Sequence, residues 1–124
     1  MATKIKIIRS VDYLSVSDQG NVEFDESKKK LASLAEPKRP PADYELLLDF
    51  RRTQWILSTE EIHSLVQALI EAPDSFRDKI ALLVLPGVNF DRTYFQELCA
   101  GDRPGTDVRT FTNYEDAIQW FHGG

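Results

Sequence analysis

Three short apolar runs, each followed by a helical pattern, constrain the fold of this chain more than any other feature. The runs are YELLLD, KIALLVL and TDVRTF at 44–49, 79–85 and 106–111, and the helical patterns span 58–72, about 90–100 and 113–122. Strands that alternate with helices pair in parallel through right-handed crossovers. The first two runs are apolar without alternation, which is typical of strands covered on both faces. The third run alternates, so we expect its strand nearer an edge of the sheet.

The residues before position 44 add a hairpin and one further helix. Runs of β-branched and aromatic residues flank SDQGN, which predicts a tight turn with Gly20 at positive φ. We place strands at 4–9, 12–17 and 21–24 and a helix at 25–35. The stretch EPKRPPAD then breaks the pattern, because proline disrupts both helices and strand pairing.

The chain length and these elements together predict one domain over residues 1–124. Neither side of the proline-rich stretch is long enough to build a core alone, so the stretch joins two parts of a single domain. The predicted fold class is α/β, a sandwich with a mixed, mostly parallel sheet, an N-terminal antiparallel hairpin and about four helices.

Composition and motifs argue against several classes of function. The net charge is -5 with both signs interspersed, which disfavours a nucleic-acid partner because phosphate contacts need clustered Lys and Arg. The chain has no apolar run of roughly 20 residues and no leader pattern, so we expect a cytoplasmic protein. It also lacks the glycine-rich loops that cradle phosphates. We therefore predict that the protein is not an enzyme and uses no cofactor or metal.

Residues that often carry chemistry have ordinary interpretations here. Cys99 lies between Leu98 and Ala100, which favours a small buried side chain over a nucleophile. His63 and His122 have no partner at metal-ligand spacing. The three lysines at 28–30 form either a solvated helix face or a docking patch for acidic partners or lipid head groups, which leaves peripheral membrane contact open.

A binding site is expected where the parallel strands end. Ligands of open parallel sheets usually bind outside the carboxyl ends of the strands. Arg51 and Arg52 bring positive charge to this edge beside a helix amino terminus, which favours an anion or an acidic partner. Trp55 offers an aromatic anchor or folds over the core. The candidate binding residues are Asp49, Phe50, Arg51, Arg52, Trp55 and Phe90.

The start of the second helix pattern carries two hydroxyl groups. The sequence from Ser58 to Glu61 fits a capping box, in which the Ser side chain and the Glu side chain each bond a backbone N–H group. Ser58 and Thr59 are also the candidate phosphorylation sites. We favour the cap for Ser58.

The blocks YELLLDFR, LSTEEI, FRDKIALLV, FDRTYFQELCA and VRTFTNYEDAIQWF resemble the SpoIIAA-like branch of the STAS superfamily, often described as STAS or CRAL-TRIO-like proteins. The resemblance covers residues 44–122. It implies a mixed sheet, no established enzyme activity, and a role in protein interaction or in carrying nonpolar ligands. Better-known members are anti-sigma-factor antagonists switched by phosphorylation within an Asp-Ser-Ser/Thr-Gly turn. Here Ser58 and Thr59 occupy the helix start, and the rest of that motif is missing.

Two functions follow as expectations. The first is a non-catalytic interaction or regulatory domain of STAS type that binds a protein partner or an anionic group at the carboxyl edge. The alternative is a carrier or sensor of a lipid or other nonpolar small molecule, with Phe50, Trp55, Ile56 and Phe90 lining an apolar cleft. A homodimer is left open.

Overall fold

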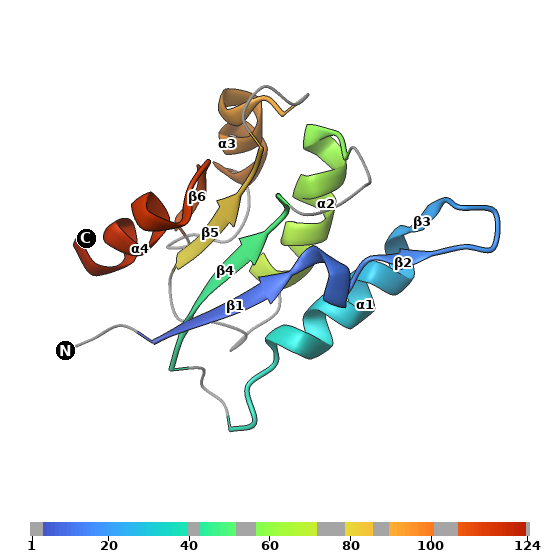
Figure 1. Cartoon of the computed structure of the whole chain (residues 1–124), viewed down its shortest axis with the longest axis horizontal. Helices are drawn as coiled ribbons and strands as arrows, with labels where there is room; N and C mark the ends of the chain where they lie inside the picture. The colour runs from blue at the N-terminus through green and yellow to red at the C-terminus, as the bar shows by residue number, and fades with distance from the viewer. Residues whose placement is uncertain are drawn as a thin grey trace.

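The computed structural model describes residues 4–39, 43–51, 57–71, 79–85, 90–100 and 107–123 (Figure 1). The strands are β1 (Ile5–Arg9), β2 (Ser15–Val16), β3 (Val22–Glu23), β4 (Glu45–Asp49), β5 (Lys79–Leu83) and β6 (Asp107–Phe111). The helices are a short 3-10 turn, η1 (Ser10–Asp12), and α1 (Phe24–Ala35), α2 (Thr59–Ile70), α3 (Arg92–Ala100) and α4 (Tyr114–Gly123). The α/β class and the helices expected from the sequence are confirmed.

The main sheet has the strand order β1-β4-β5-β6, and each of its neighbouring pairs is parallel. Because the order advances in one direction across the sheet, right-handed crossovers place α1, α2 and α3 on the same face. The run KIALLVL supplies the central strand β5, and TDVRTF supplies the edge strand β6, as expected. The antiparallel hairpin β2–β3 forms a small sheet of its own, with Gly20 at a φ of 85°.

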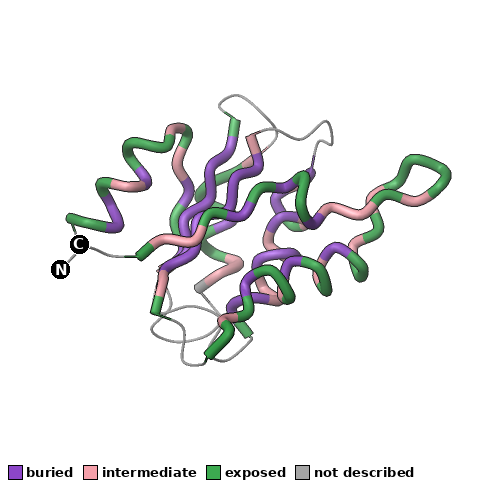
Figure 2. The backbone as a smooth tube through the Cα atoms, turned by 60° about the horizontal axis from the view of Figure 1, so that its bottom comes forward, coloured by how far each residue is buried: buried purple, intermediate pink, exposed green. Residues whose placement is uncertain are grey.

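The core lies on both faces of the sheet. On one face, Leu46 and Leu48 of β4 and Leu82 of β5 pack under α1, α2 and α3. On the other face, Leu47 and Leu83 pack with residues of α4, which contacts β5 and β6. Figure 2 shows the two middle strands buried along their length, while the outer turns of the helices are exposed. The apolar runs without alternation therefore became strands covered on both faces.

Details at several helices differ from the sequence-based expectations. Helix α4 begins at Tyr114, and its cap is Asn113, whose Oδ1 accepts a hydrogen bond from the backbone N–H of Asp116. We had expected the inner face of α3 to include Tyr94, but this side chain is exposed, and Phe95 fills the core. Leu34, expected in the buried stripe of α1, is also exposed. In the described part of the chain, no helix is both long and apolar enough to cross a membrane.

Candidate functional site

The basic turn after β4 is anchored by an ion pair. Asp49 is 8% exposed, and its carboxylate accepts hydrogen bonds from the backbone N–H of Arg51 at 2.9 Å, from Nε at 3.1 Å and from Nη2 at 3.2 Å. The hydrogen bonds to Asp49 raise the pKa of Arg51, and the charge of Glu115 adds to this effect. Arg51 is therefore neutralised by the protein itself. This pairing gives no support to an anionic ligand held by Arg51.

The amino terminus of α2 is closed by its own side chains. The Ser58 hydroxyl accepts a hydrogen bond from the backbone N–H of Glu61, and the Glu61 carboxylate accepts one from the backbone N–H of Ser58. The capping box is confirmed. Thr59 is 5% exposed, and its hydroxyl accepts a hydrogen bond from the backbone N–H of Asp91 at 3.0 Å. Both candidate phosphorylation sites thus hold helix ends together.

The described charges at the carboxyl edge are mainly acidic. Carboxylates begin or precede the helices that follow β4, β5 and β6, where they complement the positive end of each helix dipole. The residues are Glu60, Glu61, Asp91, Glu115 and Asp116. Glu60 also lies close enough to Tyr94 of α3 to raise the pKa of its hydroxyl. The edge therefore favours cationic groups over anionic ones.

Exposed apolar side chains gather in the segments that leave the same edge. Val11, in the 3-10 turn after β1, is 67% exposed, and Leu85, two residues after β5, is 45% exposed. Tyr114 and Tyr94, in the first turns of α4 and α3, are 41% and 37% exposed. Exposed apolar and aromatic side chains combined with charges are typical of protein-binding surfaces. We refer to Val11, Leu85, Tyr94 and Tyr114 as the apolar edge residues.

The two candidate phenylalanines belong to the core. Phe50 is 5% exposed and packs edge to face against Tyr13, with ring centroids 6.1 Å apart. Phe90 is partly buried, and its ring lies 5.2 Å from that of Phe95. The structure therefore brings Asp49, Phe50 and Arg51 together in one short segment but turns the rings inward. Arg52, Trp55 and Ile56 lie outside the described residues.

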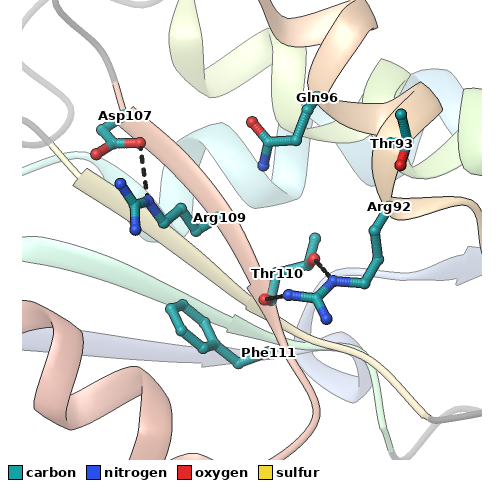
Figure 3. A pocket seen from close by; sticks show the side chains of 7 residues that line it. All are labelled: Arg92, Thr93, Gln96, Asp107, Arg109, Thr110 and Phe111. Atoms are coloured by element: carbon teal, nitrogen blue, oxygen red, sulfur yellow. Dashed lines mark hydrogen bonds and ion pairs between the residues drawn. The ribbon is translucent and has the colours of Figure 1, made fainter.

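A polar groove runs along the outer edge of β6 and has a volume of about 430 Å³. Its lining side chains come from α3 and β6 and are shown in Figure 3: Arg92, Thr93, Gln96, Asp107, Arg109, Thr110 and Phe111. Arg92 donates to Thr110, whereas Arg109 pairs with Asp107 at 3.5 Å. Sequence reasoning missed this groove. A usable signal was the spacing of Arg92 and Gln96, which places two long polar side chains on one face of a helix beside an edge strand.

Buried hydroxyl groups without a partner lie close to the end of β1. Tyr13 is fully buried, and Ser10 is 1% exposed. Neither hydroxyl oxygen has a hydrogen-bond partner among the described residues. Burial raises the pKa of Tyr13 well above its usual value, and the negative charge of Asp49 raises it further. This end of the sheet therefore contains polar groups whose bonding capacity the described residues leave unused.

We compared the chain with family models, with curated proteins and with solved structures, and none of the three comparisons found a significant match. The resemblance to SpoIIAA-like STAS proteins accordingly stays a prediction, and the functional argument rests on the geometry described above.

Proposed function

We propose that this domain is a non-catalytic interaction module that binds a basic segment of a protein partner at the carboxyl edge of its sheet. The observation that carries the proposal is the exposure of Val11, Leu85, Tyr94 and Tyr114 beside carboxylates in the same edge segments. Tyrosine suits such a surface because its ring offers contact area and its hydroxyl tolerates water. The carboxylates supply charge complementarity for Lys or Arg of the partner.

The use of polar groups at this edge supports a non-catalytic role. The groups that could serve as nucleophile or base are engaged in holding the fold. The Ser58 hydroxyl caps α2, the Thr59 hydroxyl binds the backbone before α3, and the Asp49 carboxylate binds Arg51. A residue that closes a helix end or anchors a turn is not free to take or give a proton. The same engagement argues for Ser58 as a structural cap rather than a phosphorylation switch.

The surface can be tested with a matched pair of double variants. The edge variant carries Val11→Ser and Leu85→Ser. The control variant carries Val16→Ser and Leu34→Ser, which remove the same two kinds of exposed side chain from the hairpin and from α1. Tagged forms of both variants and of the unaltered chain are expressed in the native host, and the captured proteins are quantified by mass spectrometry.

We expect basic proteins captured by the unaltered chain to be retained by the control and lost from the edge variant. Capture that is equal for all three forms would refute an edge-binding role. Native mass spectrometry of the purified chain tests the carrier alternative. A retained nonpolar molecule, in a preparation whose capture does not depend on Val11 and Leu85, would favour the carrier.

A further inference from the structure

The outer edge of β6 has an unusual arrangement of backbone carbonyl groups. β6 is the last strand in the order β1-β4-β5-β6. The carbonyl of Phe111 accepts a hydrogen bond from the backbone N–H of Val84 on the β5 side. Because backbone groups alternate between the two sides of a strand, the carbonyl and N–H groups of Val108 and Thr110 face away from β5. These are the groups to which a further strand would bind.

Two side chains of α3 occupy part of that position. Gln96 donates from Nε2 to the carbonyl oxygen of Val108 at 2.7 Å. Arg92 donates from Nη2 to the carbonyl oxygen of Thr110 and from Nε to the Thr110 hydroxyl, both at 2.7 Å (Figure 3). Side chains thus satisfy the carbonyls that an added strand would otherwise meet. Long side chains can move aside, whereas a backbone strand cannot.

The groove also carries positive charge that the protein does not neutralise. Among the described residues, no carboxylate forms an ion pair with Arg92, while its two bonds to Thr110 hold its guanidinium group in place. Arg109 shares Asp107 and lies 5.4 Å from the centre of the Trp120 ring. The lining therefore has one more positive than negative side chain in a chain with a net charge of -5. An orientated guanidinium group favours a carboxylate.

We propose that this groove binds an extended acidic segment of another protein, which adds beside β6 as a fifth strand of the sheet. The segment bonds to the outward backbone groups of Val108 and Thr110, and one of its carboxylates pairs with Arg92. A second copy of this chain fits less well. Two β6 strands paired antiparallel about their midpoints would place one Arg109 opposite the other, and like charges in that position repel.

The test uses the whole chain and three labelled heptapeptides that alternate Val with Glu, Gln or Lys. All three have blocked ends and the same extended shape. We expect the Glu peptide to bind about tenfold more tightly than the Gln peptide at low salt, and the Lys peptide to bind weakest, because one charge-assisted contact is worth roughly that factor. Added salt should narrow the difference between the Glu and Gln peptides. Equal binding of these two peptides would overturn the proposal.

Two further measurements locate the binding. In amide NMR spectra, the largest shifts on adding the Glu peptide should fall at Val108 and Thr110, and shifts confined to β1 or the hairpin would overturn the proposal. Arg92→Gln should weaken the Glu peptide about tenfold and leave the Gln peptide nearly unchanged. Arg9→Gln is the matched control, because Arg9 lies on β1 at the opposite edge of the sheet. An equal loss in both variants would also contradict the assignment. The peptide series on the unaltered chain remains decisive if Arg92→Gln impairs folding.

Discussion

Replacing Tyr13 with Phe is expected to stabilise the fold. The Tyr13 side chain is fully buried, and its hydroxyl has no hydrogen-bond partner among the described residues. A buried hydroxyl that gives up water without gaining a partner costs about 1 to 3 kcal/mol. Removing the oxygen leaves a void smaller than a methyl group, which returns part of that gain. We therefore expect Tyr13→Phe to raise the free energy of unfolding by about 1 kcal/mol, measured by urea denaturation.

The same variant should change how stability depends on pH in the alkaline range. Burial raises the pKa of Tyr13 in the folded state above its value in the unfolded chain, and Asp49 adds to the shift. The stability linked to this group is fully present below the unfolded pKa of about 10 and is lost as the pH rises above it, by roughly 1.4 kcal/mol per pH unit. Tyr13→Phe removes this contribution. The variant should lose less stability between pH 9 and 11 than the unaltered chain, by about that amount.

Tyr44→Phe provides the control with the opposite sign. The Tyr44 hydroxyl donates a hydrogen bond to the carbonyl oxygen of Ala35, so its removal should lower the free energy of unfolding by about 1 kcal/mol. The reasoning would be refuted if Tyr13→Phe destabilised the fold as much as Tyr44→Phe does. That result would show that the Tyr13 hydroxyl has a partner in solution, and Asp49 would be the first residue to examine.

Three further substitutions test the other local arguments by urea denaturation. Ser58→Ala should cost about 1 kcal/mol because the capping box is lost, whereas Ser58→Asp should be nearly neutral, and equal stability of Ser58→Ala and the unaltered chain would contradict the cap. Leu83→Ala should cost about 2 to 5 kcal/mol because it opens a cavity in a fully buried position, and a change below about half a kcal/mol would contradict the central placement of β5. Arg51→Ala should cost about 1 to 3 kcal/mol because buried Asp49 loses two charged hydrogen bonds, and an unchanged unfolding midpoint would show that the pair is unimportant.

Features set by neighbouring residues could be predicted from the sequence. The capping box from Ser58 to Glu61 depends on contacts within one helical turn, and the buried strands depend on the apolar runs YELLLD and KIALLVL. The strand order also follows from handedness once strands and helices alternate. The start of α4 was misplaced by one residue because Thr112 and Asn113 both suit a cap, and only the backbone geometry distinguishes them.

Features that depend on distant residues could not be predicted. Tyr94 has the spacing of a core residue, but Phe95 takes the buried position and leaves Tyr94 beside Glu60 of α2. The groove at β6 requires α3 to lie against a strand that follows it in the chain, so Arg92 gave no local sign of its bonds to Thr110. The pairing of Asp49 with Arg51 turned an expected binding cation into an anchor, because a chain that bends after a strand brings side chains two positions apart into contact.

The strand order has a consequence for the growing chain on the ribosome. Each strand of the main sheet pairs with the strand that precedes it in this order, so β4 adds to β1, β5 adds to β4, and β6 adds to β5. No strand has to be inserted between two that are already paired. A nascent chain can therefore extend its sheet one βα unit at a time during synthesis, and the edge exposed at each step is covered by the next unit to emerge. Stalled chains of increasing length should accordingly gain protease resistance in successive steps rather than in one step at completion.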